Sequence, residues 1–394
     1  GYAAMAADDE EGLSILVDTF EANAAAYIAK GYALGDYTYD RYKSDAEGTD
    51  GAVTLVGAGN GSRDLFESDL VHLVAGVSLA RNLGNAPGNA IYPETFIDTV
   101  RTAFRGTGNV SFRVLNPRDM ERRGMGALLG VGQGSVREPR LLVITYSGGP
   151  RDAAPLALVG KGVTFDTGGI SLKESDTMWR MKADLSGAAA VAGAVLAAAK
   201  RRAPLNLVGV MPLAENMPGA NAIRPGDVLT TSSGKTIEIL NTDAEGRLIL
   251  ADAITYTQTE FDPYMLLNIA TLTGSAARAT GDEYGAVMTR DFALSTEMMD
   301  IGEAAGEPVW PLPLHPNHFD QIVSDVADIK NLGGSPGAST AAALVGSFVD
   351  EDRPWVHLDM AGVFFADGSV PGYPKGHAGW GVRFMDTLVR RESE

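Results

Sequence analysis

The chain has 394 residues, a length that suggests a large domain and a smaller one. Of these residues 45% are hydrophobic and 21% charged, a composition typical of a soluble globular protein. Its formal net charge of -18 opposes the phosphate backbone, and no cluster of Lys and Arg exceeds residues 200–202, so nucleic acid is excluded as an expected partner. Because the chain contains no cysteine, disulfides, thiolate metal sites and cysteine nucleophiles are excluded as well.

Two stretches bear on targeting and membranes. Residues 1–12, GYAAMAADDEEG, are acidic and lack the basic start and apolar core of a signal peptide. The longest apolar run, residues 187–199, is rich in alanine and too short to span a bilayer. We therefore expect a cytoplasmic protein without a membrane partner.

The sequence of the N-terminal part of the chain predicts a small α/β region. Apolar residues from Leu13 to Ile28 recur at helical spacing and predict an amphipathic helix. Residues 37–44 and 51–56 are typical of strands around a polar turn. A second helix through residues 66–77 is expected to stop at the sequence GNAPGN, residues 84–89. That Gly/Pro/Asn cluster predicts a division into a small region of residues 1–82 and a larger domain of residues 83–394.

Beyond this boundary, apolar runs alternate with helical stretches. The strand-like runs are residues 110–115, 141–146, 156–160, 205–213, 265–272 and 355–362. This alternation predicts an α/β fold with a mixed, largely parallel, twisted sheet that helices flank on both faces. Ligands of such folds gather at the carboxyl ends of the strands.

Charged residues stand at these expected strand ends and helix starts. Lys161, Asp166 and Lys173 follow the run of residues 156–160, and Asp184 precedes an alanine-rich helix. The stretch NTDAEGRLIL, residues 241–250, adds Asp243, Glu245 and Arg247.

Each of these residues also has an ordinary structural interpretation. Thr242 and Glu245 fit a capping box at a helix start, and Asp184 alone fits an N-cap. Lys161 and Lys173 fit salt-bridge partners of the acids.

Taken together, the seven charged residues favour a metal site. Carboxylates held close to one another repel unless cations neutralise them, and divalent ions do this better than lysines and an arginine. The five histidines form no HExxH motif. A site built of carboxylate oxygens suits Zn, Mn or Mg in a co-catalytic pair. A lysine ligand would have to lose its proton, which a neighbouring dication favours.

Three segments closely resemble the leucyl aminopeptidase family, the cytosolic two-metal exopeptidases of the M17 type. They are VGKGVTFDTGGISLK (residues 159–173), MKADLSGAAAV (181–191) and NTDAEGRLILADA (241–253). The resemblance extends over residues 81–394 and includes ARNLGNAPGN, ATLTG, IKNLGG and WVHLDMAG. It implies release of N-terminal amino acids, Leu- or Met-like ones preferred, by attack of a metal-bridging hydroxide on the peptide bond.

The resemblance also implies a role for each matching residue. Asp166 and Glu245 would bridge two metals, Lys161 and Asp184 would complete one site, and Asp243 would complete the other. The metals would be Zn or Mn, with Mg or Co as further candidates. Lys173 matches an electrophilic lysine and Arg247 an arginine that holds bicarbonate as the general base.

Five further positions match the substrate cleft of the family, although each also fits an ordinary core or turn residue: Met181, Thr271, Leu272, Gly274 and Phe364. Phe364 stands where the family commonly presents methionine to the pocket for the first side chain of the substrate.

The resemblance implies peptide substrates with a free N-terminus and a homohexamer. Residues 1–82 are too few for the complete α/β N-terminal domain that family members usually carry, so we expect a truncated N-terminal region. Two alternatives from other classes stay open at this point: a metal-binding scaffold without activity, and a metallohydrolase of phosphate esters.

Overall fold

A nine-stranded mixed sheet forms the centre of the protein in the computed structural model, which describes residues 13–17, 23–46, 53–368 and 373–393. The strand order is β12 (Val309–Pro311), β11 (Gly285–Met288), β14 (Trp355–Asp359), β10 (Met265–Ala270), β5 (Leu156–Gly160), β7 (Asn206–Asn216), β4 (Arg140–Ser147) and β3 (Val110–Leu115). The ninth strand, β6 (Gly162–Asp166), pairs with the end of β7.

The middle of this sheet is parallel, and antiparallel pairs join the flanks to it. Strands β14, β10, β5 and β7 pair in parallel, in that order. On one side β4 pairs antiparallel to both β7 and β3, and on the other β11 pairs antiparallel to β14 but parallel to β12. The six strands expected beyond the predicted boundary are all present, and the prediction of a mixed, largely parallel sheet flanked by helices is confirmed.

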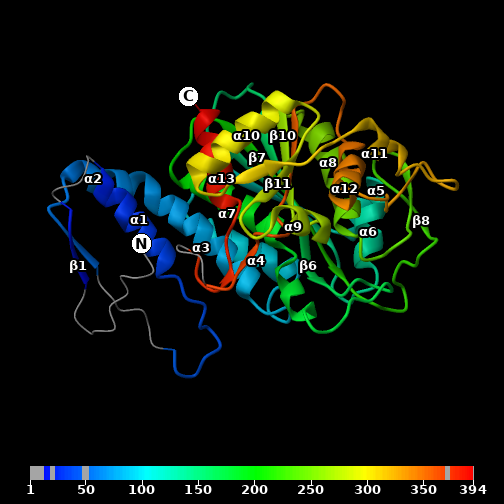
Figure 1. Ribbon diagram of the computed structural model, residues 1–394, viewed down its shortest axis with the longest axis horizontal. Helices are drawn as coiled ribbons and strands as arrows, with labels where there is room; N and C mark the ends of the chain where they lie inside the picture. The colour runs from blue at the N-terminus through cyan, green and yellow to red at the C-terminus, as the bar shows by residue number, and fades with distance from the viewer. Residues whose placement is uncertain (1–12, 18–22, 47–52, 369–372, 394) are drawn as a thin grey trace.

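Helices cover both faces of the sheet (Figure 1). One face packs against α3 (Val71–Asn85), α4 (Pro93–Ala103), α7 (Ser186–Lys200), α10 (Phe292–Ala305) and α13 (Val382–Arg391). The other face packs against α5 (Pro117–Arg122), α6 (Gly126–Gly132), α8 (Gly246–Phe261) and α12 (Gly337–Gly346). Neighbouring strand residues serve opposite cores: Leu141 lies in the second and Leu142 in the first, as strand alternation requires.

Helix α7 lies deep in the first core. All of its residues from Ser186 to Ala199 are buried, and its small side chains admit close helix packing. A Cβ added to Gly76 of α3 would collide with the carbonyl oxygen of Gly193 in α7. The helical stretch Met178–Lys200 is long and apolar enough to cross a membrane, in contrast to our estimate for residues 187–199, but 89% of its apolar window is buried inside the protein. Such burial is typical of a core helix.

The N-terminal region departs from the sequence prediction. Residues Leu13–Leu16 form strand β1, not a helix, because their backbone pairs in parallel with β2 (Val53–Val56). Periodicity alone cannot distinguish a short apolar run in a strand from one in a helix. Helix α1 begins only at Ala24 and ends at Gly35. Phe20, part of the predicted helix, lies outside the described residues, as do residues 51 and 52 of the second predicted strand.

The strand predicted at residues 37–44 is also wrong. This segment is irregular, and Tyr37 and Tyr39 contact the rest of the protein through their side chains, whereas Tyr42 is exposed. The Tyr37 hydroxyl donates to Asn82 Oδ1 at 2.8 Å, and Tyr39 packs against the first core.

The predicted second helix is present as α2 (Asn60–Leu65), a π-helical turn (Phe66–Leu70) and α3. Helix α3 ends at Asn85, and Ala86 is extended before Pro87, within the predicted stop signal. The division of the chain at residues 82 and 83 stays a prediction.

Candidate metal centre and active site

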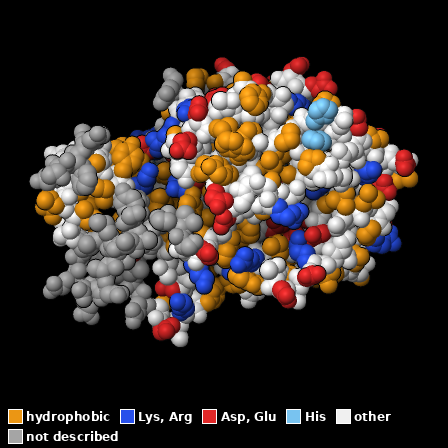
Figure 2. All heavy atoms as spheres, in the orientation of Figure 1, with side chains coloured by type: hydrophobic (Ala, Val, Ile, Leu, Met, Phe, Trp, Pro, Cys, Tyr) orange, Lys and Arg blue, Asp and Glu red, His pale blue; other side chains and the backbone are white. Residues whose placement is uncertain are grey.

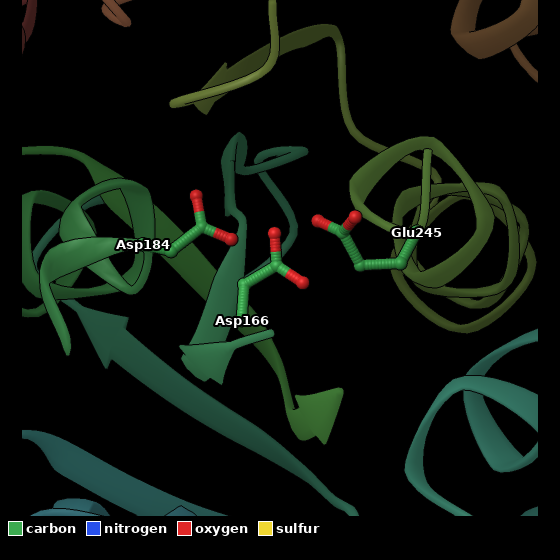
Figure 3. A group of neighbouring side chains, drawn as sticks. All are labelled: Asp166, Asp184 and Glu245. Carbon is green, nitrogen blue, oxygen red and sulfur yellow. The ribbon is translucent and has the colours of Figure 1, made fainter. Parts of the chain in front are cut away.

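Three acidic side chains converge at the carboxyl ends of the central strands (Figure 3). Asp166 ends β6, Asp184 follows the 3-10 turn Met178–Ala183 just before α7, and Glu245 immediately precedes α8. One carboxylate oxygen from each lies within 4.8 Å of the others, and all three residues are buried. Segments far apart in the sequence therefore supply one compact set of oxygen atoms.

Burial and mutual repulsion act against the charges of this cluster. Burial, followed by the charge of Glu245, raises the pKa of Asp166 to about 7. Burial also raises the pKa of Asp184 well above its usual value. Burial would raise the pKa of Glu245 too, but the ammonium groups of Lys161 and Lys173 outweigh it and hold that pKa below its usual value. A divalent ion would favour the ionised form of every carboxylate in such a cluster.

Lys161 lies between two of the acids. Its Nζ is 2.9 Å from Asp184 Oδ1 and 2.8 Å from Glu245 Oε1, and it donates to the carbonyl oxygen of Thr271 at 2.8 Å. Burial opposes the charge of Lys161, but the surrounding carboxylates prevail and raise its pKa. A Cβ on Gly246 would come within 2.8 Å of Lys161 Nζ, so a glycine at the start of α8 makes room for this side chain.

Lys173 faces the same cluster from the open side. Its Nζ is 2.8 Å from Asp166 Oδ2 and 2.5 Å from Asp243 Oδ1, and 24% of its side chain is exposed. Burial again opposes the charge, and the carboxylates, that of Asp166 first, raise the pKa of Lys173. Burial raises the pKa of Asp243, the least buried acid of the group.

Arg247 is almost fully buried in the first turn of α8. Its Nη1 donates to the carbonyl oxygen of Asn331 at 2.8 Å, whereas its Nε is buried and has no hydrogen-bond partner among the described residues. Burial lowers the pKa of Arg247 to about 10, which leaves the guanidinium charged at neutral pH. A buried, charged donor without a partner suits a small anion.

The two capping interpretations are wrong. Glu245 is itself the N-cap residue of α8, and no side chain caps that helix start. The Thr242 hydroxyl instead donates to the carbonyl oxygen of Gly168 at 2.6 Å and accepts from the Ser171 amide at 2.8 Å. Asp184 does not cap α7, whose N-cap residue is Leu185. Thr242 and Asp184 thus bond to distant segments at the cluster instead of capping helices.

One cavity of about 540 Å³ opens onto this cluster. On the face shown in Figure 2, acidic and basic side chains gather around a hollow in the larger body. The cavity is lined by all twelve residues that the sequence singled out: Lys161, Asp166, Lys173, Met181, Asp184, Asp243, Glu245, Arg247, Thr271, Leu272, Gly274 and Phe364. Thr271 also supports the cluster directly, since its hydroxyl donates to Asp184 Oδ1 at 2.7 Å.

Sequence reasoning missed two buried asparagines that position this set. Asn216, at the end of β7, donates from Nδ2 to Asp166 Oδ1 at 2.8 Å and to the Thr242 carbonyl at 3.0 Å. Asn331 accepts from Arg247 through its carbonyl and from the Leu240 amide through Oδ1. In the sequence only the position of Asn216 at the end of an apolar run could have indicated its role.

The chemistry of the donors fits divalent cations. Asp184 Oδ2 and Glu245 Oε2 are buried and accept no hydrogen bond from the described residues, so each is free to bind a cation. Oxygen donors and a buried lysine amine on an open cavity are suited to ions that also contact substrate. Fold and site together define the chain as an α/β protein of the metallohydrolase type.

Comparison with known proteins narrows this class. Residues 78–385 match the catalytic domain of the cytosol aminopeptidase family. A probable cytosol aminopeptidase from Syntrophotalea carbinolica is 45% identical over 377 residues, covering 94% of this chain and 75% of the relative. One from Rickettsia bellii is 41% identical over 379 residues, with the same two coverages.

A solved structure agrees with these relatives. The bottromycin maturation enzyme BotP in complex with Mn superposes with a TM-score of 0.86 at 35% identity, covering 94% of this chain and 80% of that one. The chain belongs to the cytosol aminopeptidase family, which confirms the resemblance. Membership supports a metal-dependent exopeptidase that acts at the N-termini of peptides.

Proposed function

We propose that the protein is a two-metal aminopeptidase that releases N-terminal residues, Leu- and Met-like ones preferred, from peptides with a free N-terminus. The observation that carries this proposal is the buried triad of Asp166, Asp184 and Glu245, with its two unpartnered oxygens, on the wall of a substrate-sized cavity. Family membership and the relatives named cytosol aminopeptidase support both the activity and a cytoplasmic location.

Five residues would hold the metals. Asp166 and Glu245 would bridge the two ions, Lys161 and Asp184 would complete one site, and Asp243 the other. Zn and Mn are the first candidates and Mg and Co the next, and the complex of BotP with Mn supports a divalent ion. When bound, two such ions would supply a nucleophile at neutral pH and polarise the scissile carbonyl.

Lys173 is proposed as the electrophile. Its ammonium group is half-buried at the cavity side of Asp166 and Asp243, where it can donate to the negative oxygen that develops as the peptide carbonyl is attacked. Donors fixed before the reaction need no reorganisation in the transition state, so this contact would raise kcat.

Arg247 is proposed to hold a bicarbonate ion as the general base. Its unpartnered, buried Nε and its place on the cavity wall support an anion at this position. The carbonyl of Asn331 fixes the orientation of the guanidinium from behind.

The substrate pocket is proposed to include Met181, Thr271, Leu272, Gly274 and Phe364, all of which line the cavity. Met181, Leu272 and Phe364 supply its apolar surface, which suits a Leu or Met side chain. A homohexamer is proposed on family membership alone, and light scattering on the 41.4 kDa chain tests it.

Three substrates offered to metal-loaded protein test the function. We expect the protein to hydrolyse leucine p-nitroanilide. It should hydrolyse neither the N-acetylated form of that compound nor p-nitrophenyl phosphate. Equal hydrolysis of the acetylated compound would contradict the requirement for a free amine. Hydrolysis of the phosphate ester alone would favour a phosphoesterase, and turnover of none of the three would favour a scaffold.

A further inference from the structure

Arg278 lies at the rim of the catalytic cavity and has no role in the reaction proposed above. It belongs to helix α9 (Gly274–Thr280), is exposed, and lines the same cavity as the metal cluster. Its side chain folds back along the helix: Nη1 lies 3.3 Å from the position that a Cβ on Gly274 would take. The guanidinium therefore lies close to Gly274, another residue that lines the cavity.

The guanidinium of Arg278 is available to bind a ligand. Within the ranges that the structure describes, no hydrogen bond or ion pair engages its guanidinium. The other cationic groups of the cavity all have protein partners: Lys161 and Lys173 pair with the acids, and Arg247 donates to Asn331. In a chain of net charge -18, an unpaired arginine beside a substrate site suits an anionic group of the substrate.

Contacts of α9 place Arg278 beside the pocket for the first side chain. The residues just before the helix bond to Asp359, where the Leu272 amide donates to Oδ1 at 3.1 Å. At the other end, a Cβ on Gly362 would collide with the carbonyl oxygen of Gly281 and lie 3.4 Å from Cα of Ala277. Helix α9 thus packs directly against the turn that leads to Phe364, so Arg278 and Phe364 line the cavity from two neighbouring segments.

We propose that Arg278 binds the side-chain carboxylate of an acidic first residue, so that the pocket accepts N-terminal Glu and Asp besides Leu and Met. The inference rests on the proposed aminopeptidase function. The apolar wall would contact the methylene groups of the glutamate side chain, and the guanidinium would pair with its carboxylate, an arrangement that the planar fork of arginine suits.

Glu and Gln p-nitroanilides test this charge recognition, because the two substrates have nearly the same shape. We expect Arg278→Met to lower the ratio of kcat/KM for Glu to kcat/KM for Gln about fivefold, the range of a partly solvated ion pair. Arg278→Lys should restore part of the ratio, and Arg278→Glu should lower it further. The matched control is Arg151→Met, which removes an exposed arginine from a turn outside the cavity and should leave the ratio unchanged.

Binding of the products supplies a readout besides turnover. Calorimetry should find that L-glutamate binds more weakly to the Arg278→Met protein than to wild type, whereas L-glutamine binds equally well to both. An unchanged Glu to Gln ratio in the variant, with glutamate binding also unchanged, would overturn the inference.

Two further outcomes separate this inference from a different role for Arg278 and from failure of the proposed function. If Arg278→Met instead alters the preference for Leu-Gly over Leu-glycinamide, the arginine contacts the C-terminal carboxylate of a dipeptide, and the side-chain assignment is wrong. If wild-type protein hydrolyses no amide with a free amine, the proposed function itself fails and this inference fails with it.

Discussion

Two groups of residues line the catalytic cavity and differ in burial and in chemistry. The first group, called here the buried wall, is Asp166, Asp184 and Glu245, which are at most 6% exposed and stand at the ends of buried strands and helices. The second group, called the open wall, comprises Met181 and Phe364, which are half-buried, and Arg278, which is exposed; they lie on a 3-10 turn, a loop and a short helix. A rigid, buried wall suits a fixed reaction, and a more open one suits the choice among substrates. Substitutions should therefore cause large losses on the first wall and modest changes of preference on the second.

The largest effect is expected at the centre of the buried wall. Glu245→Gln replaces a carboxylate that is proposed to bind both metals by an amide, a poor donor to a dication, and should lower metal content and reduce kcat/KM by about a thousandfold or more. Metal analysis beside kinetics measures both. Asp252→Asn is the matched control: Asp252 is equally buried but accepts from the Leu128 and Ser232 amides outside the cavity, so metal content should stay at the wild-type value. Full metal content in the Glu245 variant would remove that residue from the metal site.

Lys173→Met separates transition-state stabilisation from metal binding. Because Lys173 is proposed to contact the developing oxyanion, the variant should keep both metals yet lose about 10²- to 10³-fold in kcat. Lys235→Met, on an exposed lysine that donates to the Ser347 carbonyl, is expected to behave like wild type. Loss of metal from the Lys173 variant would reassign the residue as a ligand.

The residues behind the buried wall should have a smaller effect. Asn216→Ala removes the amide that fixes Asp166 Oδ1, and outer hydrogen bonds of this kind contribute about 10- to 100-fold to metal affinity. A metal-binding titration measures the change. Asn206→Ala removes a half-buried amide far from the cavity that donates to the Pro150 and Ala153 carbonyls, and should not alter affinity. Equal affinities of the two variants would contradict a positioning role for Asn216.

The open wall should show the smallest effect. Methionine repacks around varied ligands, whereas phenylalanine is rigid, so Phe364→Met should improve Phe and Trp amides relative to Leu and Met amides by a few-fold to tenfold, or about 1 kcal/mol. The measurement is kcat/KM for the four amides. Phe365→Met is the control, since Phe365 stacks edge-on against Trp179 and does not line the cavity. An identical profile in wild type and the Phe364 variant would exclude Phe364 from the pocket.

The large domain could be predicted from the sequence because its strands are buried on both faces. Runs such as residues 156–160 and 265–270 are apolar at every position or nearly so, and five or six residues are a typical length for a strand but short for a helix. Strands β11 and β12 have only four and three residues and give no such signal. In the N-terminal region, Leu16 is 59% exposed and Val56 46% exposed. These strands are too little buried to show the continuous apolar pattern of the central strands.

The buried wall of the site could also be predicted, since charged residues at strand ends are conspicuous against an apolar background. The sequence could not predict the hydrogen bonds that hold these charged residues in place. Thr242 resembled a helix cap because Glu245 follows it by three positions, yet its hydroxyl bonds to Gly168, some seventy residues away in the chain. Asn216 and Asn331 resembled ordinary loop amides for the same reason: their partners are set by tertiary structure.

The central claim is that activity depends on a metal pair held by the buried wall. The most direct test is to remove all metal with a chelator, verify its absence by metal analysis, and then titrate Mn or Zn back while measuring bound ions and hydrolysis of leucine p-nitroanilide. We predict no hydrolysis by the metal-free protein and a rise in activity that saturates at two bound ions per chain. Full activity of verified metal-free protein would contradict the account.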